Sequence, residues 1–192
     1  MLSINACKVI AIGASTGGVE AITQVLSDFP ADIPPVLLVL HMPLGFTKMF
    51  AETLNERLVI SIKEAQSGDY LRMNQVLIAP AGKHMKVVNI NGKLAVECYL
   101  GERVSFVIPS ADVLFESVAD VLQKDAVGVI MTGMGADGAR GLLKMYNNGA
   151  ATIGQNKDSC VIYGMPKIAK ELGAVEYEVP LNKIADTVLS LI

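Results

Sequence analysis

The stretch Ile12-Gly13-Ala14-Ser15-Thr16-Gly17-Gly18 separates the apolar run from Lys8 to Ile12 from a segment, Val19 to Phe29, whose apolar residues recur at helical spacing. A strand, a tight glycine-rich turn and a helix in this order predict the beginning of a βαβ unit. The turn places the Ser15 hydroxyl where a parallel sheet opens. The first question is whether this serine is a nucleophile or belongs to a phosphate-binding loop.

Buried strands and helices alternate along most of the rest of the chain. Strands are predicted at 36–40, 126–131 and 151–153, and helices at 46–58, 111–123, 166–172 and 181–191, with another around Leu142, Leu143 and Met145. In the middle, turn residues separate the short runs 60–62, 76–79, 86–90 and 93–100. Asn91-Gly92 between the last two predicts a type I′ hairpin. We therefore predict a single α/β domain over residues 1–192, with a doubly wound, mostly parallel sheet, helices on both faces and an antiparallel hairpin insertion.

The composition excludes several classes of protein. Hydrophobic residues make up 52% of the 192 residues and charged ones 18%, which favours a well-covered sheet. A net charge of −3 without clustered Lys or Arg argues against a nucleic-acid partner. The apolar run Val36 to Leu40 is too short to span a bilayer and no signal peptide precedes it, so we expect a cytoplasmic protein without membrane insertion. The three cysteines and two histidines form no C-x-x-C or H-E-x-x-H pattern, so neither a metal nor a cofactor is expected.

The first glycine-rich turn fits more than one motif. Gly13-Ala14-Ser15-Thr16-Gly17 matches G-x-S-x-G, in which small neighbours expose a serine on a sharp strand-to-helix turn. Gly13 and Gly18 match the Walker spacing, but Val19 stands where its lysine should be, and Ser15 replaces the second glycine of the dinucleotide fingerprint. The turn alone leaves a nucleophile and a non-standard phosphate cradle equally possible.

Two other polar residues are expected at the same edge as Ser15. His41 ends the strand 36–40, and Asp137 lies in a second glycine-rich turn after the strand 126–131. A serine nucleophile needs an adjacent base that a third group orients, and these two residues can supply both. Asp137 could instead cap the helix that follows it, a role that a carboxylate can combine with orientation.

The remaining candidates fit a catalytic role less well. The chain order Ser, His, Asp differs from the Ser, Asp/Glu, His order of the α/β-hydrolases. His84 is a rival base, but it opens the predicted hairpin and is assigned a structural or substrate-side role. Cys160 has neither a helix N-terminus nor a histidine beside it and is interpreted as filler.

Several motifs together resemble a known family. They are Gly13-Ala14-Ser15-Thr16-Gly17-Gly18, His41-Met42-Pro43, Pro109-Ser110-Ala111-Asp112-Val113-Leu114-Phe115, Thr132-Gly133-Met134-Gly135-Ala136-Asp137-Gly138-Ala139 and Gly164-Met165-Pro166. In these the chain resembles the catalytic domain of the chemotaxis protein-glutamate methylesterases. The resemblance implies hydrolysis of glutamate γ-methyl esters on the cytoplasmic helices of bacterial chemoreceptors with release of methanol, and in some members deamidation of receptor glutamines.

The resemblance also assigns roles by motif. It implies that Ser15 is the nucleophile, His41 the base, Asp137 its orienter, the Met134 backbone N–H an oxyanion donor and Thr16 a support for the histidine, without a cofactor. Family members usually carry an N-terminal receiver domain, and none is expected here. Leu40 stands where a glutamine is expected. The competing hypothesis is a non-catalytic phosphate- or nucleotide-binding α/β domain.

Overall fold

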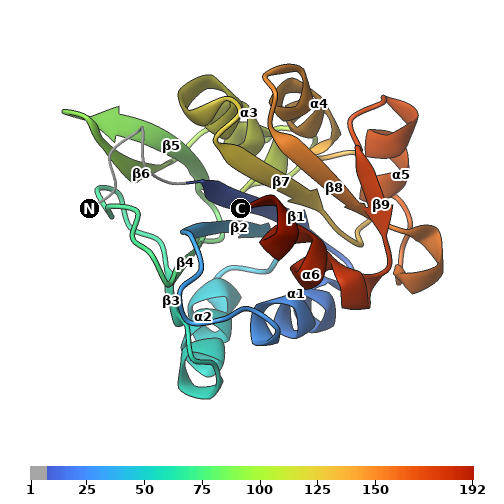
Figure 1. The fold of residues 1–192 in the computed structure, drawn as a ribbon. Coiled ribbons are helices and arrows are strands. Elements are labelled where there is room, and N and C mark those ends of the chain that lie inside the picture. The colour runs from blue at the N-terminus through green and yellow to red at the C-terminus, as the bar shows by residue number, and fades with distance from the viewer. Residues whose placement is uncertain (1–7) are drawn as a thin grey trace.

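Strand β1 (Val9–Ala14) lies at the centre of a seven-stranded parallel sheet (Figure 1). The computed structural model of the chain describes residues 8–192. The strand order is β3-β4-β2-β1-β7-β8-β9. The other strands are β2 (Val36–Leu40), β3 (Ser61–Glu64), β4 (Gln75–Ile78), β7 (Ala126–Ile130), β8 (Ala151–Gln155) and β9 (Tyr177–Val179). The sheet grows from β1 first toward β2 and later toward β7, so its topological switch point lies between β1 and β7, where α/β folds bind ligands.

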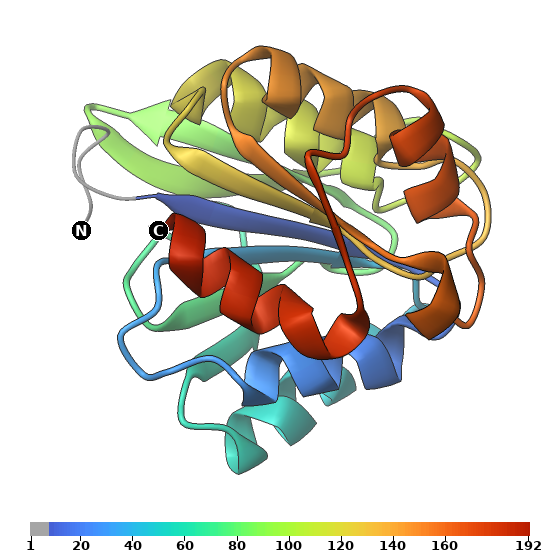
Figure 2. The same ribbon diagram turned by 45° about the vertical axis from the view of Figure 1, so that its right-hand side comes forward.

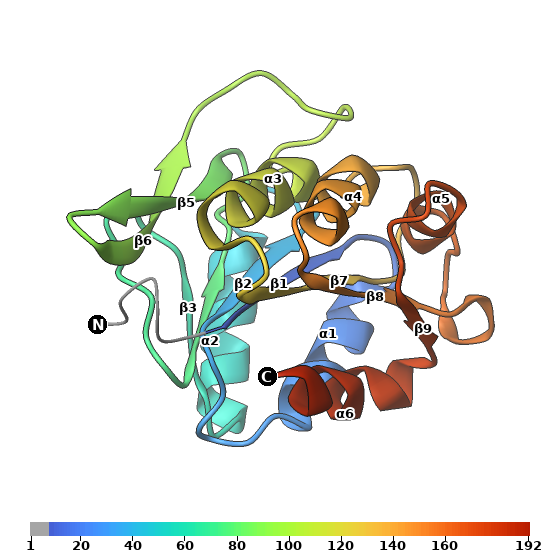
Figure 3. The ribbon, with the colours of Figure 1, turned by 45° about the horizontal axis from the view of Figure 1, so that its top comes forward.

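Helices cover both faces of this sheet (Figures 2 and 3). One face packs against α1 (Gly18–Ser27), α2 (Phe46–Arg57) and α6 (Leu181–Leu191), and the other against α3 (Ala111–Leu122), α4 (Ala139–Asn147) and α5 (Met165–Glu171). The alternation along β1 explains this, since Ile10 and Ile12 are buried in the first core and Val9 and Ala11 in the second. No helix in residues 8–192 is both long and apolar enough to cross a membrane.

The antiparallel insertion is a separate hairpin of β5 (His84–Ile90) and β6 (Lys93–Tyr99). Asn91 and Gly92 have φ values of 52° and 79°, as a type I′ turn requires, so the predicted hairpin is confirmed. Met85 and Val87 join the core on the α3 face. The hairpin therefore extends the α3 layer and leaves the main sheet parallel throughout.

The fold class is as predicted, and the differences are local. The strands β3 and β4 join the parallel sheet, although they are separated only by turns in the sequence. The short strand β9 and the 3₁₀ helix Lys157–Ser159 were not predicted. β8 extends two residues beyond its apolar run because Gln155 is fully buried, with its side chain accepting from Thr132 N (2.8 Å) and donating to Ser159 O (2.7 Å).

Candidate active site

Ser15 and His41 are the first residues beyond the ends of two adjacent parallel strands. Ala14 pairs with Leu40, so the two residues occupy the next position in register. The His41 amide donates to the Ala14 carbonyl at 3.2 Å, and the Ser15 amide donates to the Thr132 carbonyl at 3.0 Å. The backbone of three neighbouring strands therefore holds the serine at the switch point and the histidine beside it, at the end of β2.

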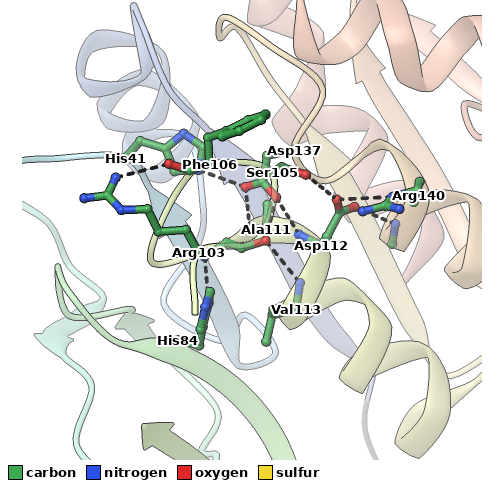
Figure 4. A network of polar contacts seen from close by, with 12 residues as sticks. His41, His84, Arg103, Ser105, Phe106, Ala111, Asp112, Val113, Asp137 and Arg140 are labelled. Carbon is green, nitrogen blue, oxygen red and sulfur yellow. Dashed lines mark hydrogen bonds and ion pairs between the residues drawn. The ribbon is translucent and has the colours of Figure 1, made fainter. Parts of the chain in front are cut away.

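His41 contacts Asp137 through a short side-chain hydrogen bond (Figure 4). The His41 Nε2 lies 2.9 Å from Asp137 Oδ2, and the side chains are only 14% and 3% exposed. An ionised carboxylate can only accept, so Nε2 carries the hydrogen and Nδ1 is left with a lone pair. The pair is therefore arranged as a base and its orienting group.

The hydroxyl of Ser15 forms no hydrogen bond with any side chain or backbone group in residues 8–192, including His41. Ser15 is half-buried. In enzymes without bound substrate, contacts between nucleophile and base are often long and tighten only in the complex. The structure therefore brings His41 and Asp137 into contact and places Ser15 beside them without the contact that proton transfer requires.

The N-terminus of α3 holds the Asp137 carboxylate. Ser110 Oγ donates to Oδ1 at 2.5 Å, Ala111 N to Oδ2 at 2.6 Å and Asp112 N to Oδ1 at 3.2 Å. Unpaired N–H groups and the positive end of a helix dipole stabilise an anion at this position. Asp137 therefore occupies the N-terminus of a helix distant in sequence, while the following helix α4 has Gly138 as its N-cap, which corrects the local capping hypothesis.

Ser110 is a site residue that the sequence analysis missed as such. Its side chain also accepts from Val113 N at 3.4 Å, which makes it the N-cap of α3. A serine directly before a predicted helix is a recognisable capping signal. No local pattern indicates that the same hydroxyl donates its hydrogen to Asp137, because that contact crosses 27 positions of the chain.

These contacts decide the charge of Asp137. Burial by itself raises the pKa of this carboxyl, but the hydrogen bonds from His41, Ser110 and the backbone of Ala111 and Asp112 outweigh it, so the pKa lies below its ordinary value of 3.8. Asp137 is therefore ionised at neutral pH and able to stabilise a protonated imidazole.

The lowered pKa predicts a pH-dependent contribution to stability. As the pH falls, the unfolded chain protonates Asp137 near 3.8, before the folded protein does. Ionised Asp137 thus stabilises the fold above that pH, and the contribution is lost as the pH falls through the native pKa. We expect Asp137→Asn to lower the free energy of unfolding by about 1.5–3 kcal/mol at pH 7, the usual value for a hydrogen bond to a charged group. Urea unfolding should show this difference shrinking below pH 4, and a constant difference would contradict the prediction.

The loop after β7 supplies a free backbone donor near Ser15. The Gly133 amide donates to Ile162 O at 3.0 Å and its carbonyl accepts from Met165 N at 2.8 Å. The Met134 amide, in contrast, donates to no group within residues 8–192, and the Met134 side chain is 74% exposed. The Thr132 hydroxyl donates to Thr16 O at 2.9 Å, which ties this loop to the serine turn. The Met134 N–H is therefore available to a substrate oxygen.

Thr16 is present at the site through its backbone. Its side chain is exposed and makes no hydrogen bond to His41 in this structure. A role of the Thr16 side chain in supporting the histidine stays a prediction.

Neither His84 nor Cys160 is available as a catalytic group in this structure. The buried His84 ring has Nε2 at 2.8 Å from Glu102 O, while Nδ1 accepts from Ser110 N at 3.2 Å. With both nitrogens engaged by backbone groups, His84 has a structural role, and it supports the serine that holds Asp137. Burial raises the pKa of the Cys160 thiol to about 11, which leaves it protonated and unreactive at neutral pH.

Comparison with known proteins identifies the family. Residues 10–188 match the family model described as CheB methylesterase. The chain belongs to the CheB methylesterase family. It is 55% identical over 184 residues to a protein-glutamate methylesterase/protein-glutamine glutaminase of Syntrophomonas wolfei, covering 96% of this chain and 54% of that protein. A namesake from Rhizobium johnstonii is 50% identical over 187 residues, with coverage of 96% and 53%.

A solved structure from the same family has the same fold. The crystal structure of the Thermotoga maritima CheB methylesterase catalytic domain is similar at a TM-score of 0.94 and 33% identity. The similarity covers 97% of this chain and 100% of that one. The chain therefore has the fold of a CheB methylesterase catalytic domain and spans about half the length of the curated relatives it matches.

In this member of the CheB methylesterase family, the described residues offer little for a metal. No group of three or more His, Cys, Asp or Glu side chains within residues 8–192 could hold an ion.

Close packing around the Met134 loop gives a second prediction. A Cβ on Gly164 would lie 2.6 Å from the Gly133 carbonyl oxygen and 3.1 Å from the Gly135 nitrogen, so the backbone that carries Met134 would have to move. A displacement of about 1 Å in a catalytic group can cost about 10²-fold in rate. We expect Gly164→Ala to lower kcat by about 10- to 100-fold, measured in a steady-state esterase assay.

Gly173→Ala is the matched control for that variant. Gly173 has a φ of 77° and nothing within 4 Å of an added Cβ. The substitution should cost about 1 kcal/mol of stability through backbone strain alone. Its kcat should stay at the unsubstituted level, and an equal loss of kcat in both variants would contradict a specific effect on the loop.

Proposed function

We propose that this chain is the catalytic unit of a cytoplasmic serine esterase that hydrolyses glutamate γ-methyl esters on bacterial chemoreceptors and releases methanol. The observation that carries the proposal is the His41–Asp137 pair, 2.9 Å apart, next to Ser15 in strand register. Membership of the CheB methylesterase family and the printed names of the relatives support the substrate class. Those names also support deamidation of receptor glutamines as a second reaction.

The proposed reaction has two steps. Ser15 Oγ attacks the ester carbonyl while His41 Nδ1 takes the hydroxyl proton, and ionised Asp137 stabilises the resulting imidazolium. The Met134 N–H donates to the oxyanion. The tetrahedral intermediate collapses, the imidazolium returns its proton to the departing methoxide, and an acyl-serine remains. Water, deprotonated by His41, then cleaves the acyl-serine to give glutamate and regenerate Ser15.

The same arrangement accounts for an amide substrate. A glutamine side chain presents the same carbonyl with an amino group in place of the methoxyl group. The His41 imidazolium would then give its proton to the departing amide nitrogen, which leaves as ammonia, and the acyl-serine would be identical. Glutamate is the product of both reactions.

Methanol release from methylated chemoreceptor membranes is the experiment that tests this function. The rate of methanol release should rise in proportion to the enzyme concentration. Receptors that carry glutamine at the same positions should release ammonia instead. Receptors already fully demethylated serve as the control substrate. Binding of a nucleotide without methanol release would instead favour a non-catalytic phosphate-binding domain.

A further inference from the structure

A pocket of about 380 Å³ opens beside His41. Its lining is His41, Met42, Pro43, Leu44, Ala81, Gly82, Arg103, Val107 and Ile108. Most of these side chains are apolar, none of them is a carboxylate, and Arg103 is the one permanently charged residue among them. The catalytic chemistry described above uses only His41 at the edge of this pocket, so the remaining lining is free to bind another part of the substrate.

Arg103 is held at this pocket by a tight turn. Val104 N donates to Val107 O at 3.1 Å and Val107 N to Val104 O at 3.0 Å. The two central residues, Ser105 and Phe106, have φ values of 51° and 66°, although neither is glycine. Residues other than glycine rarely adopt a backbone conformation with positive φ, and such backbone strain clusters at ligand-binding sites.

The guanidinium of Arg103 has most of its donors unused. One nitrogen donates to the Phe106 carbonyl at 3.1 Å (Figure 4), and within residues 8–192 Arg103 forms no ion pair. A guanidinium has five N–H groups in a planar fork that matches a carboxylate. The exposed Arg140, in contrast, lies 3.9 Å from Asp112. Arg103 is therefore a charged group at the site without an acidic partner of its own.

We propose that this pocket binds an unesterified glutamate side chain of the substrate protein, close to the esterified glutamate, and that Arg103 pairs with its carboxylate. The proposal rests on the proposed function. The two methylene groups of a glutamate suit the apolar wall, and its carboxylate suits the guanidinium. A methyl ester or an amide at that position has no charge and loses the pair. On a helical substrate, residues three or four positions apart lie on one face with Cβ atoms about 5–6 Å apart, which makes one helical turn the natural spacing.

This arrangement gives the reaction an order. Hydrolysis of one ester produces a carboxylate, and that carboxylate then favours hydrolysis of an ester one turn away. A substrate with two neighbouring esters should react more slowly at its first site than at its second. Arg103 thereby acts as a specificity-determining residue that reads the modification state of the substrate.

The test is a cycle of two enzymes and two substrates. The substrates are chemoreceptor fragments that carry one glutamate methyl ester and either glutamate or glutamine one helical turn away. The enzymes are the unsubstituted protein and Arg103→Gln, and initial rates of methanol release are measured before any glutamine is deamidated. We expect kcat/KM of the unsubstituted protein to be about fivefold higher for the glutamate substrate, near the upper range for an exposed ion pair. The preference should disappear in Arg103→Gln and weaken with salt. Arg103→Lys should recover part of it.

Arg72→Gln provides the control, because Arg72 is exposed and outside the pocket lining. It should keep the fivefold preference. An equal loss of kcat/KM on both substrates in Arg103→Gln would overturn the proposal and would mean that Arg103 only stabilises the turn at 104–107. If Arg103→Gln only relieved inhibition by the product and kept the preference for the glutamate substrate, the proposal would be overturned, and Arg103 would bind the carboxylate of the product instead. Ser15-dependent methanol release from the glutamine substrate reports separately on the proposed function.

Discussion

Replacement of Ser15 by alanine should reduce methanol release by about 10³-fold or more, because it removes the proposed nucleophile. Loss of one member of a serine triad typically costs several orders of magnitude in kcat, since the remaining groups have no nucleophile to activate. The fold should be unaffected. The hydroxyl makes no hydrogen bond in residues 8–192, and the substitution removes only one oxygen from a half-buried side chain.

The measurement is kcat on methylated receptor membranes, together with the thermal midpoint of unfolding. Ser27→Ala is the matched control, because Ser27 is exposed and its hydroxyl only donates to Gln24 O at 2.7 Å in the last turn of α1. That variant should retain full activity. If Ser15→Ala kept a tenth of the unsubstituted rate with an unchanged thermal midpoint, Ser15 would not be the nucleophile.

Asp137→Asn should lower kcat by about 10⁴-fold, as the same change does in serine proteases. Asp137 accepts from His41 and from three groups at the start of α3. With the amide nitrogen toward His41, two donors, the amide N–H and the Nε2–H, would face each other. The imidazole then has to carry its hydrogen on Nδ1, which is the wrong tautomer for a base. With the amide oxygen toward His41, that hydrogen bond survives, but the negative charge that stabilises the imidazolium is lost and the amide nitrogen faces the Asp112 N–H. Both orientations slow the proton transfer.

Asp112→Asn separates this effect from the loss of any buried charge nearby. Burial raises the pKa of Asp112, and its Oδ1 accepts from Gly141 N at 2.8 Å, a contact that an asparagine oxygen can replace. Asp112 makes no contact with His41, so this variant should lose less than tenfold in kcat. Equal losses in the two variants would mean that the acidic cluster as a whole, and not Asp137, supports the base.

The sequence alone was sufficient to place Ser15, His41 and Asp137 at one edge of a parallel sheet. Each follows a continuous apolar run, and such runs are typical of strands buried on both faces. Because parallel strands end at the same edge, the order of runs and turns in the chain places these residues together without any knowledge of contacts. The hairpin turn at Asn91-Gly92 was predictable for a similar reason, since its conformation depends on those two residues themselves.

The tertiary structure alone decided which groups complete the site. Ser110 is a local helix cap by sequence, and only the packing of α3 against the loop after β7 brings its hydroxyl to Asp137. Likewise, only the fold brings Arg103 and the turn at 104–107 to the pocket beside His41, which both Arg103 and Val107 line. The physical reason is that hydrophobic periodicity and turn preferences depend on a few neighbouring residues. A hydrogen bond between distant side chains needs two backbone segments positioned to within a few tenths of an ångström. Only the packed core supplies that precision.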